Sequence, residues 1–146
     1  MEQKDYLLRE IEKIGDIIRA IRQKLFGGTD DLAISVANQA EALKEMMLSE
    51  AFIDLDEILA MDTAETDAYL AGQKGFNVEN IELLAQTLAD TGMTPAPPVS
   101  FAMLEKALQL YEICNLRDRT FSFEREAAIS QLREALKPDS SVIPPM

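Results

Sequence analysis

Residues 5–26 read DYLLREIEKIGDIIRAIRQKLF, and large aliphatic side chains recur in this stretch at steps of four and three. They belong to Leu7, Ile11, Ile14, Ile18, Ile21 and Leu25. Because an α-helix repeats about every 3.6 residues, this spacing predicts one amphipathic helix over about residues 4–26. Acidic residues at its start and basic residues near its end suit the helix dipole, and Gly27-Gly28 ends it.

The aliphatic seam of this helix must pack against the same chain or against a second copy. In heptad terms Leu7, Ile14 and Ile21 occupy d positions, where isoleucine does not favour a parallel two-stranded coiled coil. Leu8 and Ile17 widen the seam into the broad stripe typical of a helix that faces a globular core. We therefore expect the helix to dock on its own chain, and a homodimer through part of its length stays the alternative.

The remainder of the chain continues with helical spacing. Apolar residues recur in this way over about residues 30–48, 49–61, 63–70, 78–91, 101–114 and 123–136, with Phe52 and Phe101 among those expected to face inward. Side chains suited to capping precede most of these segments: Thr29 or Asp30, Asp62 with Glu65 as a capping box, Asn77, Ser100 and Ser122. No segment alternates with period two over five or more residues. The predicted fold class is all-α, with six to seven helices packed as antiparallel hairpins.

The length of 146 residues suits a single domain, expected over residues 1–138 and followed by a flexible tail over 139–146. TPAPPV, at residues 94–99, reads as a stiff connector inside the domain. The ending AAISQLREALKP, at residues 127–138, is similar to the second helix of a tetratricopeptide unit. No 34-residue self-similarity accompanies it, so tetratricopeptide-like packing is the most that it indicates.

Charge and composition exclude several classes of function. The net charge is −12, and residues 29–91 carry two basic against fourteen acidic side chains, a surface that repels the phosphates of nucleic acids. We interpret this surface as solubilising; a basic partner or divalent cations are the alternatives. No apolar run reaches membrane-spanning length, and the charged start MEQKDY lacks the apolar stretch of a signal peptide, so we expect neither a membrane span nor a signal peptide. Cys114 is the sole cysteine, so a reducing, cytoplasmic location is expected.

Few chemistries are open to this chain. It has no histidine, which removes Ser-His-Asp and Cys-His systems, and it contains no GxGxxG, GxxxxGK[ST] or GxSxG motif. Cys114 shares a helix with core residues and has only Arg117 as a nearby cation, so we expect a structural, partly buried thiol. Tyr111-Glu112 and Arg117-Asp118-Arg119 flank a turn and either line a groove or cover neighbouring helices.

Carboxylate chemistry is the sharpest catalytic alternative. Six acidic residues crowd one part of the middle segment: Asp54, Asp56, Glu57, Asp62, Glu65 and Asp67. Hard cations prefer oxygen ligands, but the calcium-loop pattern breaks at Ile58 and Leu59. Helix caps and a solvated face are the simpler interpretation, and we predict no metal site there.

Three segments together resemble a known family. KDYLLREIEKIG, NVENIELLAQTL and ALQLYEICNL...TFSFEREAAISQLREAL are similar to short, uncharacterised bacterial all-helical proteins with an Asp-Tyr-Leu/Ile N-terminal helix. The matching positions are Asp5-Tyr6, Tyr111-Glu112 and Phe121-Ser122-Phe123-Glu124. The resemblance implies an all-helical unit and carries no assigned activity.

These observations favour a non-enzymatic protein-interaction or scaffold module with an unidentified protein partner. A carboxylate- or metal-dependent enzyme that uses residues 54–67 is one alternative. A small-ligand-binding sensory domain is the other, and a buried pocket with convergent polar groups would support it. We predict no catalytic, cofactor-binding or metal-ligating residue, no cofactor, and no binding to nucleic acid or membrane.

Overall fold

The computed structural model describes residues 2–27, 38–93, 101–119 and 122–137, and within these ranges it contains helices and no strand. The helices are α1 (Glu2–Phe26), α2 (Gln39–Ala51), α3 (Leu55–Leu59), α4 (Thr63–Ala71), α5 (Val78–Gly92), α6 (Phe101–Asp118) and α7 (Phe123–Leu136). The predicted all-α fold class is therefore confirmed. The predicted connector over 94–99, the tail over 139–146 and the caps at Thr29 or Asp30 and Ser100 lie outside the described residues.

Local sequence signals set several helix starts. The Asp62 side chain accepts from the backbone N–H of Glu65, whose own side chain accepts from the backbone N–H of Asp62, so the predicted capping box is present. Asn77 caps α5 and Ser122 caps α7 as predicted. Such side chains satisfy N–H groups that the first helical turn leaves without partners.

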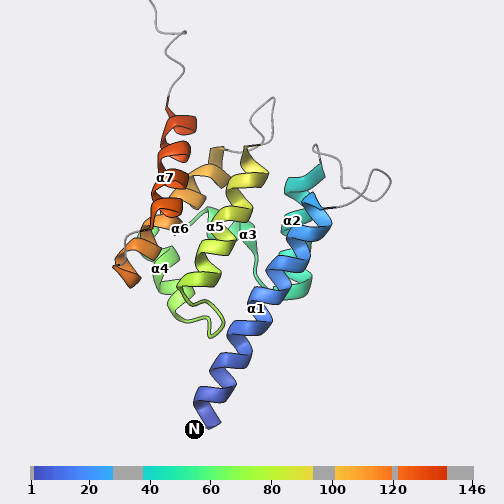
Figure 1. Cartoon of the computed structure of the whole chain (residues 1–146). Coiled ribbons are helices and arrows are strands. Elements are labelled where there is room, and N and C mark those ends of the chain that lie inside the picture. The colour runs from blue at the N-terminus through green and yellow to red at the C-terminus, as the bar shows by residue number, and fades with distance from the viewer. Residues whose placement is uncertain (1, 28–37, 94–100, 120–121, 138–146) are drawn as a thin grey trace, which may run out of the picture.

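Helix α5 lies at the centre of the domain. It packs most extensively against α6 and also contacts α1 and α2, while α6 in turn contacts α3, α4 and α7. Figure 1 shows α1 and α2 running in opposite directions, and α6 running against both α5 and α7, so consecutive long helices form antiparallel hairpins. A tetratricopeptide-like superhelix remains a prediction.

One hydrophobic core holds these helices together. Its fully buried members include Ile18, Ile21, Leu25, Leu43, Met47, Ile53, Leu55, Ile58, Leu70, Ile81, Leu84, Leu88, Leu110, Ile113, Ile129 and Leu132. They come from all seven helices and from the turn between α2 and α3. The described helices therefore form a single all-α domain. None of them is long and apolar enough to cross a lipid bilayer.

Helix α1 docks on its own chain along only part of its length. Ile18, Ile21 and Leu25 are buried, whereas Leu7 and Leu8 are 43% and 50% exposed. The first third of α1 extends beyond the rest of the domain, and we had no reason from the sequence to expect this protrusion (Figure 1). The cause is length: α1 has 25 residues and spans about 37 Å, but α2 and α5, against which it packs, span only about 20 and 22 Å.

Asn80 marks the point at which α1 enters the body of the domain. Its Nδ2 donates to the carbonyl of Ile11 at 2.8 Å and to that of Gly75 at 2.7 Å. A Cβ at position 75 would collide with Ile14 and lie 2.8 Å from the carbonyl oxygen of Glu10, so only glycine permits this close approach. The loop between α4 and α5 is thereby fixed against α1.

Two aromatic residues predicted to face inward do not. Phe52 is 81% exposed and lies at the C-terminal end of α2, where the next residue, Ile53, enters the core instead. Phe101, the first residue of α6, is also exposed, and its helix buries Met103 and Leu104. Helix-wheel reasoning fails at both positions because each lies at a helix end, where the direction of a side chain depends on the chain entering or leaving the helix.

Candidate functional site

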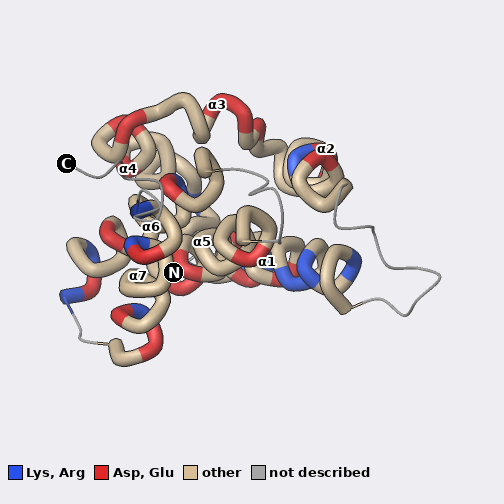
Figure 2. Tube along the Cα trace, turned by 90° about the horizontal axis from the view of Figure 1, so that it is seen from above, with Lys and Arg blue, Asp and Glu red and all other residues tan. Residues whose placement is uncertain are grey.

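The acidic segment is largely explained by capping and ion pairs. Asp54 caps α3 by accepting from the backbone N–H groups of Asp56 and Glu57, and Asp62 caps α4. Asp56 pairs with Lys44 of α2 at 3.0 Å, and this hydrogen bond raises the pKa of the lysine. Figure 2 marks the acidic positions of α3 and α4 in red along the Cα trace. Among the described residues no group of three or more Cys, Asp or Glu is arranged to hold a metal.

Asp67, the last acidic candidate, holds α4 to α6. The Arg117 Nη2 donates to its Oδ1 at 2.6 Å and to its backbone carbonyl at 3.0 Å, and Nε donates to Oδ1 at 3.1 Å. From the sequence, Arg117 was the only cation expected near Cys114. In the structure its guanidinium group binds Asp67 instead. The acidic residues named from the sequence do not converge on one another.

A buried lysine that the sequence analysis did not single out lies under α4. Lys106 of α6 is 2% exposed, and its Nζ donates to the carbonyl of Met61, to Thr66 Oγ1 and to Gln109 Oε1 at 2.6–2.8 Å. Burial lowers its pKa, which Asp62 and other nearby carboxylates oppose. The three acceptors use all three N–H bonds of the ammonium group, so Lys106 is a structural tie between α4 and α6.

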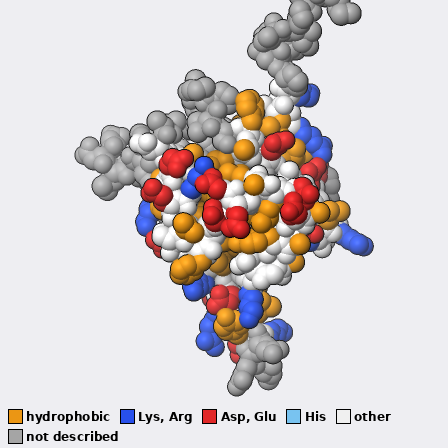
Figure 3. Space-filling view, turned by 180° about the vertical axis from the view of Figure 1, so that it is seen from behind, with side chains coloured by type: hydrophobic (Ala, Val, Ile, Leu, Met, Phe, Trp, Pro, Cys, Tyr) orange, Lys and Arg blue, Asp and Glu red, His pale blue; other side chains and the backbone are white. Residues whose placement is uncertain are grey.

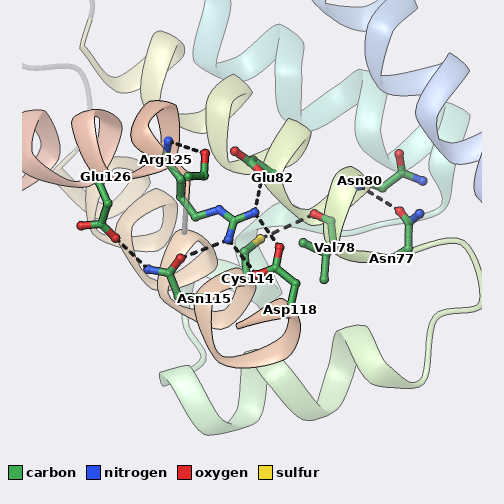
Figure 4. Close-up of polar contacts among 10 residues, drawn as sticks. Asn77, Val78, Asn80, Glu82, Cys114, Asn115, Asp118, Arg125 and Glu126 are labelled. Atoms are coloured by element: carbon green, nitrogen blue, oxygen red, sulfur yellow. Dashed lines mark hydrogen bonds and ion pairs between the residues drawn. The ribbon is translucent and has the colours of Figure 1, made fainter. Parts of the chain in front are cut away.

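The densest polar cluster joins α5, α6 and α7 around Arg125 (Figure 4). Its Nη1 donates to Asn115 Oδ1 and Asp118 Oδ1, both at 3.1 Å, and its Nη2 donates to Asp118 Oδ2 at 3.0 Å and Glu82 Oε1 at 2.9 Å. The hydrogen bond with Asp118 is the main reason that the pKa of Arg125 is raised. Arg125 is 4% exposed and its two carboxylate partners are partly buried, so this bidentate pair fixes three helices relative to one another.

Cys114 lies beside this cluster and is fully buried, more completely than the partly buried thiol that we predicted. Its Sγ lies 3.5 Å from the carbonyl of Val78, to which it donates. Burial raises the pKa of the thiol to about 12, and Arg125 only partly opposes this effect. A protonated, inaccessible thiol is not a nucleophile at neutral pH.

Replacing Cys114 by alanine should lower the free energy of unfolding by about 1–2 kcal/mol, because the sulfur fills core volume that alanine leaves empty. Urea unfolding followed by circular dichroism measures the change. A thiol reagent should label the native protein slowly at neutral pH. Labelling as fast as in urea would show that the thiol is accessible, contrary to the structure.

Raising the pH through the range 9 to 12 should destabilise the fold, with Cys114 as one cause. Above pH 9 the unfolded chain loses the thiol proton while the folded chain retains it, so stability falls as pH rises, by up to about 1.4 kcal/mol per unit. Tyr111, whose pKa burial raises to about 12, acts in the same direction. The loss between pH 8 and 10 should be about 1 kcal/mol smaller in Cys114→Ala than in the wild type, and equal losses would contradict this account.

The groove proposed for the C-terminal hairpin is present only in part. Tyr111 lines a cavity of about 240 Å³ between α5 and α7, together with Asp90 and Leu132 among others. Glu112 instead faces Arg133 of α7 at 3.6 Å, and Arg117 binds Asp67. The cavity is smaller than typical ligand pockets, which begin at about 300 Å³.

A second hollow, of about 210 Å³, lies where α1 enters the body of the domain. Its lining residues come from α1, from the end of α2 and from the loop between α4 and α5: Glu10, Lys13, Ile14, Ile17, Glu50, Ala51, Phe52, Gln73, Lys74, Gly75 and Phe76. Phe52 stands at its edge with a backbone φ of 59°, in the left-handed region that bulky residues rarely adopt.

The protruding start of α1 adjoins this hollow. Tyr6, Leu7 and Leu8 are each 43–50% exposed, and the Nζ of Lys74 lies 5.0 Å from the centre of the Tyr6 ring. Figure 3 shows this part of α1 extending below the body, with hydrophobic side chains among charged ones. We call residues 4–10 the N-terminal arm, and the arm with the hollow and Phe52 the docking surface. The sequence shows how long the aliphatic seam is, but not which part of it the other helices leave uncovered.

The geometry defines an all-helical hairpin domain whose buried charged groups form structural ties. Four of its exposed apolar side chains, Tyr6, Leu7, Leu8 and Phe52, lie on the N-terminal arm or line the adjoining hollow. No protein-family model matches the sequence, and searches of curated proteins and of solved structures find no similar protein. The resemblance to short bacterial helical proteins therefore stays a prediction.

Proposed function

We propose that this chain is a non-enzymatic protein-interaction module that binds its partner, another protein or a second copy, through the docking surface. The observation that carries the proposal is Phe52, a large aromatic side chain that is 81% exposed on a left-handed backbone. A non-glycine residue in this conformation costs roughly 1–2 kcal/mol, and such strain tends to persist at functional positions.

The surroundings of Phe52 support a protein partner. The hollow combines apolar walls from Ile14, Ile17 and Phe76 with charges of both signs. Exposed aromatic side chains beside apolar surface are enriched in protein interfaces, where polar groups surround the apolar contacts. The buried charges of Lys106 and Arg125 bind groups on neighbouring helices, which supports a scaffold role rather than catalysis. A single buried thiol supports a cytoplasmic location.

Photo-crosslinking in the native cell tests this proposal. A benzoylphenylalanine placed at position 52 should form a discrete covalent adduct on irradiation. The same residue at position 123 is the matched control, because Phe123 is 82% exposed but begins α7, which lies across α5 and α6 from α2 (Figure 1). An adduct at both positions, or at neither, would overturn the assignment of Phe52 and the hollow to the docking surface.

Phe52→Gly should raise the free energy of unfolding by about 0.5–1 kcal/mol, because glycine adopts the left-handed conformation without strain. The greater entropy of glycine in the unfolded chain cancels only part of this gain. Phe52→Ala removes the same ring but keeps the strained backbone, so it should not be stabilised. Thermal unfolding of the two variants compares them directly. Both should lose partner binding equally, and a Phe52→Gly variant that is less stable than Phe52→Ala would contradict the strain argument.

A further inference from the structure

We infer that the N-terminal arm binds the same arm of a second copy, with the two helices antiparallel and centred on Leu7. This inference rests on the proposed docking surface and names its partner. The contact would be made by the aliphatic seam of α1. From Ile14 onward the seam is packed against the rest of the chain, but Leu7 and Leu8 continue it into solvent.

The order of charges along the arm is self-complementary. Residues 4–10 read KDYLLRE, with Lys4 three residues before Leu7 and Glu10 three residues after it. In an antiparallel pair centred on Leu7, residues equally far before and after the centre lie at the same height. Lys4 of each copy would therefore face Glu10 of the partner subunit, on both sides of the Leu7 contact. Opposite charges that flank an apolar seam specify orientation in paired helices.

A parallel pairing would be less favourable. It would place Lys4 beside the partner's Lys4 and Glu10 beside the partner's Glu10, and it would align the two helix dipoles. The antiparallel arrangement also places the two domain bodies at opposite ends of the paired arms. Each arm then occupies the space beyond the partner's Asn80, where no described helix of that chain covers the seam.

The size of the contact predicts a weak dimer. An overlap of residues 3–11 is about 13 Å long, which is short for a specific interface. The first turn of each arm would lie at the entrance of the partner's hollow, near its Phe52, and this extends the contact. We expect a dimer whose population depends on protein concentration in the micromolar range, rather than a permanent one.

Charge reversal tests both the partner and the register. Lys4→Glu and Glu10→Lys should each raise the dimer dissociation constant of the full chain at least about tenfold in sedimentation equilibrium, and the double variant should return it to near the wild-type value. Positions 4 and 10 are six residues apart on one helix and are not neighbours there, so rescue reports a contact between copies. Arg9→Glu is the matched control: it makes the same charge change on the opposite face of the arm and should have little effect.

The outcomes separate this inference from the proposed function. A wild-type chain that stays monomeric at high micromolar concentration would show that the arm does not bind a second copy. A crosslinked adduct with another protein at position 52 would still support the proposed protein-interaction function. A dimer that none of the charge reversals weakens overturns the antiparallel register. Absence of any adduct at position 52, with the charge rescue intact, would remove the hollow from the interface and retain the paired arms.

Discussion

Ile18→Asp should leave the chain unfolded at 25 °C. Ile18 is fully buried in the middle of the α1 seam, and an unpaired carboxylate at that position costs several kcal/mol in addition to the lost packing. Small domains are stable by about 5–15 kcal/mol in total, so this single change removes much or all of the stability. Far-ultraviolet circular dichroism and one-dimensional NMR of the purified variant measure the result.

Leu7→Asp is the matched control for this prediction. It introduces the same charge on the same seam, but Leu7 lies beyond the body of the domain and is 43% exposed. The variant should keep the wild-type helix content and melting temperature within a few degrees, and it should lose only self-association. If Ile18→Asp stays folded and only shifts from dimer to monomer, the whole aliphatic seam of α1 packs against a partner rather than against its own chain. An unfolded Leu7→Asp variant would show that the arm supports the fold.

Arg125→Met should lower the free energy of unfolding by about 3–5 kcal/mol, because it leaves Glu82 and Asp118 as like charges without the cation that bridges them. Methionine keeps most of the side-chain volume, so the loss reports on charge rather than on a cavity. The midpoint of urea unfolding measures it. Glu82→Gln and Asp118→Asn, added to Arg125→Met, should restore part of the lost stability.

Arg133→Met is the control for the buried pair. Arg133 lies two turns further along α7, where its ion pair with Glu112 spans 3.6 Å and both side chains are substantially exposed. Exposed pairs contribute about 0–1 kcal/mol, so this variant should unfold near the wild-type midpoint. Equal effects of the two substitutions would mean that the Arg125 cluster is solvated and does not fix α5, α6 and α7.

Several parts of the fold were predictable because their causes are local. The helical seam of α1, the capping box at Asp62 and the caps Asn77 and Ser122 each depend on residues within about one helical turn. The burial of Cys114 followed in the same way from the apolar neighbours on its helix. The prediction that Phe52 and Phe101 face inward was wrong. Both lie at helix ends, where the helical periodicity no longer fixes the direction of a side chain.

The structural ties of the domain were not predictable in this way. Lys106 stands between Met103 and Leu110 on a buried face, and this could have marked it as a buried cation. Its acceptor Thr66, however, is 40 residues away, and Glu82 is 43 residues from Arg125. A sequence shows the members of such pairs but not which residue faces which, because that depends on how the helices pack.

The sequence by itself determined the all-helical fold, the positions of most helices and the long aliphatic seam of α1, since each follows from spacing along one helix. Only the tertiary structure decided where that seam stops being covered. The limit is set by α2 and α5, which are shorter than α1, and by the contact of Asn80 with Ile11, across 69 residues. The exposed arm and the strained Phe52 therefore became visible only when the helices were placed together.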